Sequence, residues 1–277
     1  MKVKTSPVFQ LFEQQHQEAK RLFLDLGKQI KAKKAIELLS KIEFLELYTD
    51  LMEKIHAAED KATDDVFSPF SNLKKSLRKI HHLKLVERGI KAKSRASNQT
   101  FDSFKTYLET EKRKMQKEAF DLAVGSSLKI WDDYLEKTKN ASKGLKPLMI
   151  STAIHQLVNE ELDFLNQDMK SPLGTTAFRD LFESLRKIIM LENFLIHLGF
   201  NPIFVAQIHE EIQLLKENLK PWYANHLNFQ ALTHFLSEKE NPSKKYLDWV
   251  KALKHEKKSL SSEIEKQAFE LMRKILA

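Results

Sequence analysis

The segment FRDLFESLRKIIMLENFL, residues 178–195, decides the fold class of this chain. Its large apolar residues recur every three or four positions, which places them on one face of a helix and the charged residues on the other faces. They are Phe178, Leu181, Phe182, Leu185, Ile188 and Ile189. We therefore expect a helix with one apolar stripe buried against other helices.

The same helical spacing continues through the rest of the chain. Alternating runs of Val, Ile and Thr are absent, as are the Asn-Gly and Asp-Gly pairs of tight hairpins. The few glycines and prolines fall mostly between apolar stretches. Prolines expected at the first position of a helix, and glycines expected just after a helix, are Pro7, Pro202, Pro242, Gly27, Gly125 and Gly199. The sequence predicts an all-α protein.

The expected helices follow from these stripes and breaks. They cover residues 7–26, 34–58, 69–89, 100–124, 127–139, 146–168, 176–198, 202–219, 222–237 and 243–275. The polar, basic segments KAKSRASNQT (91–100) and KTKNASKG (137–144) are expected to be loops. The second of these loops is the expected boundary between two halves.

Two pairs of segments indicate an internal repeat. The apolar residues from Ala35 to Met52 align with those from Phe178 to Leu195 at a constant offset of 143 residues. The segment QKEAFDLA (116–123) also resembles EKQAFELM (265–272). We therefore expect two pseudo-repeated antiparallel helical bundles of about four to five helices each. They would occupy residues 1–144 and 145–277.

Length and composition describe a globular chain without membrane spans. The chain has 277 residues, of which 42% are apolar and 30% charged, so it is able to form a substantial core. No apolar run approaches the roughly 18 to 20 residues of a membrane span. The first residues contain no apolar core of a signal peptide, so a cytoplasmic protein is expected. The absence of cysteine excludes disulfides, thiolate zinc sites and cysteine catalysis.

The segment NLKKSLRKIHHLK, residues 72–84, is strongly basic, and no acidic residue occurs between Val66 and Val86. On a helical wheel its cations form two adjacent stripes beside the apolar face. One stripe holds Lys74, Arg78 and His81, and the other holds Lys75, Lys79 and His82. Such stripes suit a long anion lying along the helix, and the net charge of +8 favours attraction to polyanions.

Two other interpretations of this helix stay open. It could present an ordinary solvated face, as most lysine-rich segments do, or a surface for a protein partner. Exposed helix faces usually mix Glu with Lys, so the missing acids favour an anion site. In the second half, Arg179 and Arg186 beside Phe182 would form the matching stripe, although Glu183 lies between the two arginines.

The segments LRKIHHLKLVE (77–87) and LKPWYANHLNFQAL (219–232) resemble the conserved-histidine α-helical domain, or CHAD, family. The family's first motif, roughly A-I-H-x-L-R-x-x-x-K-R-L-R, falls on AIELLSKIEFLE (35–46) and on AFRDLFESLRKI (177–188). In the second copy Arg179 takes the histidine position, and Arg186 and Lys187 keep the basic pair. His81 and His82 lie where the family's second motif has Arg-Asp.

The resemblance implies two helical bundles whose basic residues line a shared groove and bind inorganic polyphosphate without catalysis. The residues it implies, together with the basic helix, are Lys74, Lys75, Arg78, His81, His82, Arg179, Arg186 and Lys187. One alternative is a helical scaffold or protein-interaction module that has lost this site, because Ile36 or Glu37 and Phe182 replace motif positions. A nucleic-acid binder that uses the same basic face is a weaker alternative.

No enzyme, metal or cofactor is expected. The chain has neither a Gly-rich phosphate loop nor a G-x-S-x-G elbow. Glu53, His56 and Asp60 would share one helix face, but a di-iron bundle needs two Glu-x-x-His pairs and two further glutamates. This segment supplies only one such pair.

Overall fold

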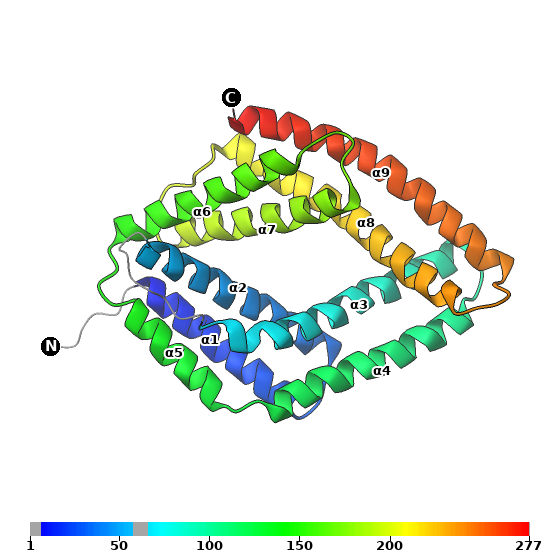
Figure 1. Cartoon of the computed structure of the whole chain (residues 1–277), viewed down its shortest axis with the longest axis horizontal. Helices are drawn as coiled ribbons and strands as arrows, with labels where there is room; N and C mark the ends of the chain where they lie inside the picture. Colours follow the sequence, from blue (N-terminus) through cyan, green and yellow to red (C-terminus); the bar gives the residue numbers. More distant parts are fainter. Residues whose placement is uncertain (1–6, 58–65, 277) are drawn as a thin grey trace. The chain divides into compact units, whose positions relative to one another are not determined.

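The computed structural model describes residues 7–57 and 66–276, and within them all regular structure is helical, which confirms the predicted class (Figure 1). A short 3-10 turn, Ser68–Phe70, precedes the third helix. The helices are α1 (Pro7–Leu26), α2 (Ala32–Ala57), α3 (Ser71–Ser97), α4 (Asp102–Gly125), α5 (Lys129–Ala141), α6 (Pro147–Asp168), α7 (Thr175–His197), α8 (Ala206–Ser237) and α9 (Lys244–Leu276).

The two predicted apolar stripes lie on α2 and α7 and are buried. In α7 every stripe residue is buried except Phe182, which is partly exposed. In α2 the aligned residues, from Ala35 to Met52, are all at most 3% exposed. Burial of such side chains contributes about 1.5–3 kcal/mol each, so each stripe holds its own helix in a core.

Helix α3 is longer than expected, and the predicted loop at 91–100 was wrong. The helix continues to Ser97 because Lys, Ala and Arg favour helix and the segment contains neither glycine nor proline. It ends at Asn98, whose φ of 49° is a left-handed conformation that asparagine tolerates well. The predicted loop at 137–144 was likewise too long, since α5 extends to Ala141.

The predicted helices 202–219 and 222–237 are one continuous helix, α8, with Pro221 inside it. A proline in a helix interior removes one hydrogen bond, but packing against α9 holds both sides of it. Asn218 Nδ2 donates to Gln267 Oε1 at 2.8 Å, and Trp222 Nε1 donates to Ser261 Oγ at 2.9 Å. Pro202 and Pro242 precede α8 and α9 by a few residues and do not begin them.

The described residues group into two compact units, each made from three stretches of the chain. Unit 1 lies within Met1–His81, Arg113–Asn159 and Met190–Pro202, and unit 2 within His82–Lys112, Glu160–Ile189 and Ile203–Ala277. Helices α3, α4, α6 and α7 contribute to both units. The units therefore differ from the sequence halves 1–144 and 145–277, and the repeat itself stays a prediction.

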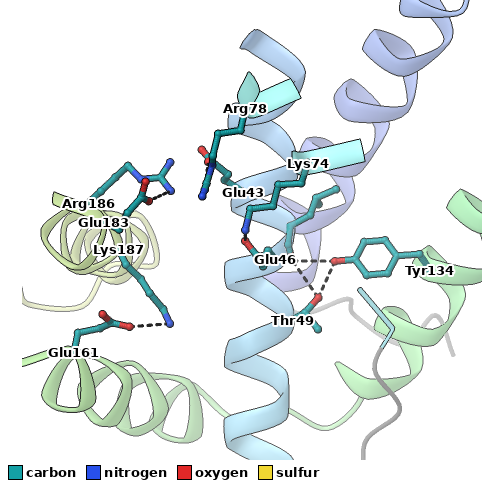
Figure 2. Close-up of polar contacts among 11 residues, drawn as sticks. Glu43, Glu46, Thr49, Lys74, Arg78, Tyr134, Glu161, Glu183, Arg186 and Lys187 are labelled. Carbon is teal, nitrogen blue, oxygen red and sulfur yellow. Dashed lines mark hydrogen bonds and ion pairs between the residues drawn. The ribbon is translucent and has the colours of Figure 1, made fainter. Parts of the chain in front are cut away.

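Unit 1 has an aromatic core in which α1, α2 and α5 meet. The Phe12 ring lies 4.5 Å from Tyr48 and 5.5 Å from Tyr134, between ring centroids. The Tyr134 hydroxyl donates to the carbonyl of Leu45 at 2.9 Å and lies 2.8 Å from Thr49 Oγ1 (Figure 2). Burial raises the pKa of Tyr134, so this hydroxyl stays protonated and serves as a structural hydrogen-bond donor.

Unit 2 is built around the long α8 and α9, which lie side by side (Figure 1). Their polar partners Asn218–Gln267 and Asn225–Glu256 show that the two helices run antiparallel. Helix α3 packs closely on α8, because a Cβ atom added at Gly89 would lie 2.1 Å from Asn228 Oδ1. The absence of a side chain at this glycine thus permits the contact.

Candidate functional site

The basic part of α3 has a buried apolar face with basic residues beside it, as the helical wheel predicts. Leu73, Leu77 and Ile80 are buried, while Lys75 and Lys79 are exposed. Of the predicted site residues, Lys74, Lys75, Arg78 and His81 belong to unit 1, and His82, Arg179, Arg186 and Lys187 belong to unit 2.

In unit 1, the first basic stripe of α3 faces acidic residues of α2. The Lys74 ammonium pairs with the Glu46 carboxylate, and Arg78 Nη2 donates to Glu43 Oε1 at 3.0 Å (Figure 2). The side chains are only partly exposed, 19% for Lys74 and 11% for Glu43. These cations therefore already have anionic partners within the unit.

The second stripe of α3 is more open to solvent. Lys79 pairs with Glu118 of α4 at 2.9 Å, and about half of each side chain is exposed. Lys75 is exposed, and it forms no ion pair with any residue in the described part of the chain. On this stripe only Lys75 keeps its charge uncompensated by a carboxylate of the described chain.

The paired histidines His81 and His82 are both partly exposed. In unit 2, His82 Nε2 lies 3.0 Å from the Tyr223 hydroxyl, and the two rings meet edge to face with centroids 5.7 Å apart. His82 is thus part of the packing of α3 on α8.

In unit 2, the basic pair of α7 is also matched by glutamates. Arg186 Nη2 donates to Glu183 Oε2 at 2.7 Å, and Lys187 Nζ lies 3.0 Å from Glu161 Oε1 of α6 (Figure 2). Glu183, which lies between Arg179 and Arg186 in the sequence, thus pairs with Arg186. Arg179 differs, because it is exposed and has no ion pair among residues 7–57 and 66–276.

Four of the eight predicted residues, Lys74, Arg78, Arg186 and Lys187, are therefore ion-paired inside their own units. The absence of acids in residues 67–85 did not predict unpaired cations, because this helix packs against helices that carry glutamates. The complementary spacing was present: Glu43 and Glu46 are three residues apart on α2, and Lys74 and Arg78 are four apart on α3.

Unit 2 contains a further cluster of polar side chains that the sequence did not predict. Lys257 Nζ of α9 donates to Thr175 Oγ1 of α7 at 3.0 Å and lies 3.3 Å from His226 Nδ1 of α8. The side chain of His226 is buried. No local motif marks these residues, because they come from three separate helices.

The structure offers no metal site among the residues it describes, where no three His, Asp or Glu side chains are grouped to hold an ion. His56 Nε2 lies 2.9 Å from the carbonyl oxygen of Ala141, which gives this ring a structural partner. Asp60, the third member of the expected cluster, lies outside the described residues. In the described part of the chain, no helix has an apolar stretch long enough to cross a membrane.

No family model matches this chain, and no curated protein or solved structure is significantly similar to it. The CHAD resemblance therefore stays a prediction from the quoted motifs.

Proposed function

We propose that this chain is a non-enzymatic helical scaffold in which the basic residues of α3 and α7 hold helices together within each unit. The observation that carries this proposal is the pairing of Lys74 with Glu46 beside the Arg78–Glu43 pair. A polyanion lying on this stripe would have to displace both carboxylates. The cations thus have a structural role that needs no ligand.

The energetics of these pairs favour a structural role. Fully exposed ion pairs contribute about 0.2–1 kcal/mol, whereas removing one partner of a buried pair costs several times more. The Lys74–Glu46 and Arg78–Glu43 pairs are partly buried and so fall between these limits. Without their cations, Glu43 and Glu46 would be neighbouring like charges on one helix face.

Titration with long-chain polyphosphate at low and physiological salt tests this proposal. The scaffold predicts that the Lys74→Glu/Arg78→Glu variant loses no more affinity for polyphosphate than for single-stranded DNA, because these cations are already paired and form no polyphosphate site. Single-stranded DNA at equal phosphate concentration is the control for general attraction to a basic chain. Tight, polyphosphate-preferring binding that the double variant loses would overturn the scaffold.

The second candidate is non-enzymatic polyphosphate binding, as the resemblance implies. The observation that favours it is the open side of α3, where Lys75 is exposed and the Lys79–Glu118 pair is half exposed. Exposed pairs are weak enough for a polymer of phosphates to exchange with them. Under this proposal Lys75→Glu weakens polyphosphate binding, and raising the salt concentration weakens it further.

The same titration covers the remaining alternatives. Equal affinity for single-stranded DNA and polyphosphate, lost in Lys75→Glu, would favour a nucleic-acid surface on α3. Turnover of a phosphorylated substrate by the purified protein would overturn the non-enzymatic part of the proposal.

A further inference from the structure

Three helices of unit 2 bring one lysine, one histidine and one threonine together. Lys257 of α9 lies 3.0 Å from the Thr175 hydroxyl and 3.3 Å from His226 Nδ1, between the polar atoms. Thr175 is the first residue of α7, where backbone N–H groups have no partner within the helix. Arg179 follows four residues later, so it lies on the same face of α7 one turn further on.

The aromatic ring of Trp222 contacts both Lys257 and His226 of this cluster. Lys257 Nζ lies 5.3 Å from the centroid of that ring, within the range of a cation–π contact. The His226 ring stacks on Trp222 with centroids 5.3 Å apart and an interplanar angle of 15°. The side chains of Trp222 and His226 are both buried, so they give the partly exposed Lys257 a rigid support.

The cluster carries positive charge that no nearby acid compensates. Neither Lys257 nor Arg179 forms an ion pair with a carboxylate among the residues that the structure describes. Glu256, the chain neighbour of Lys257, accepts a hydrogen bond from Asn225 Nδ2 at 2.8 Å. This differs from the basic residues of α3 and the Arg186–Lys187 pair, most of which have a glutamate.

The protonation states agree with uncompensated positive charge. Burial lowers the pKa of Lys257. Burial, followed by the charges of Lys257 and Arg179, lowers the pKa of His226 to about 4. His226 is therefore neutral near pH 7, and its Nδ1 accepts from Lys257, which leaves Nε2 as the protonated nitrogen.

We propose that Lys257, Arg179 and Thr175 form a binding site for a compact phosphate group, either inorganic phosphate or a phosphomonoester. Lys257 supplies a point charge and Arg179 a two-pronged donor, which is the combination that phosphate oxygens favour. The N-terminus of α7 adds N–H donors and the positive end of the helix dipole. This site is independent of the scaffold role and uses none of the ion-paired residues.

Calorimetric titration of the full chain at low salt with inorganic phosphate and with glycerol phosphate tests this site. We expect saturable binding of at least one of them, weakened about tenfold or more by Lys257→Gln and by Arg179→Gln, since each removes a charge-assisted hydrogen bond. The matched control is Lys258→Gln, which removes an exposed neighbouring lysine and should keep wild-type affinity. Whichever ligand binds more tightly identifies the source of the phosphate group.

The position of the bound phosphate can be tested separately by NMR of His226. Bound phosphate places negative charge beside His226, so the pKa of His226, followed by NMR, should rise when phosphate is added. Arg179 is exposed, so Arg179→Gln tests the site even if Lys257→Gln fails to fold. The proposal is overturned if neither ligand binds wild-type protein, or if Lys258→Gln loses as much affinity as Lys257→Gln. Binding of long-chain polyphosphate alone would also overturn it and would favour the α3 surface.

Discussion

At the scale of single residues, Gly89 decides how closely α3 approaches α8. Its missing side chain leaves room for Asn228, whose Oδ1 and Cγ would lie 2.1 and 2.5 Å from a Cβ atom there. Asn228 is buried and donates from Nδ2 to the carbonyl of Ala224 at 2.7 Å, so its side chain has little freedom to turn away. The contact therefore depends on both residues.

Gly89→Ala should lower the free energy of unfolding by about 1–3 kcal/mol, because the added methyl overlaps Asn228. In an Asn228→Ala background the overlap is gone. The same substitution should then stabilise the protein by up to about 1 kcal/mol, the helix preference of alanine over glycine. Denaturant unfolding of wild type, the two single variants and the double variant measures whether the effect of Gly89→Ala on stability changes sign. Equal stabilisation in both backgrounds would contradict the close contact.

His226 predicts a dependence of stability on pH. Its pKa is about 4 in the folded protein and 6.5 when unperturbed, because it is buried and faces Lys257 and Arg179. The unfolded chain therefore binds more protons between these two values, so stability falls as the pH drops from about 6.5 to about 4. His16 in unit 1, whose pKa burial also lowers, contributes in the same direction.

The variant His226→Gln should lose less stability than wild-type protein between pH 7 and pH 4.5, because glutamine does not titrate. Unfolding in phosphate-free buffer at the two pH values measures the difference. His155→Gln is the matched control, since it makes the same substitution at an exposed histidine. Identical pH dependence in wild type and His226→Gln would contradict the assignment of a neutral buried imidazole.

At the scale of helices, Pro221 is the one clear local conflict in α8. Its ring removes the hydrogen bond that residue 221 would donate to the carbonyl of Glu217. Pro221 is exposed, so alanine fits there without repacking. Pro221→Ala should therefore raise the free energy of unfolding by about 1–3 kcal/mol.

Pro202→Ala is the matched control for that substitution. Pro202 is also exposed but lies outside any helix, so its replacement should bring no gain and a small loss from the freer unfolded chain. Thermal or denaturant unfolding measures both variants. If Pro221→Ala fails to stabilise, a proline-specific contact holds α8 in its present form.

The sequence predicted most helices because their apolar stripes are long and periodic. It failed where tertiary packing overrides a local signal, as at Pro221, where α9 holds both sides of the break. It also failed at the end of α3, where the polar composition of residues 91–97 suggested a loop although their helix propensity is high. A polar composition predicts that a segment is exposed to solvent, and exposed segments are often helical.

One pair of helix starts has the offset of the predicted repeat. Helix α2 begins at Ala32 and α7 at Thr175, the same offset that aligns their apolar stripes. The repeat nevertheless stays a prediction, because packing divides the described residues into units that each draw on both halves of the sequence.

At the scale of the whole molecule, half of the basic residues that the sequence predicts as a polyanion site have glutamate partners within their own unit. The sequence shows where the cations of α3 and α7 lie along the chain but not their partners, because ion pairs such as Lys74–Glu46 and Lys187–Glu161 join different helices. Arg179 was predicted as a site residue, whereas Lys257 and His226 were not, since only the packing of α7, α8 and α9 brings them together. Charge pattern along a chain thus indicates candidates, and packing decides which remain available.

The central claim, that the basic helix is structural, is tested most directly by exchanging the charges of one ion pair. The variants are Lys74→Glu, Glu46→Lys and the double exchange, measured by denaturant unfolding with Lys75→Glu as the exposed control. Each single reversal should cost about 1–2 kcal/mol, the double exchange should recover most of that loss, and Lys75→Glu should change stability by less than about 0.5 kcal/mol. Single losses near zero, or losses that simply add in the double variant, would contradict a structural ion pair.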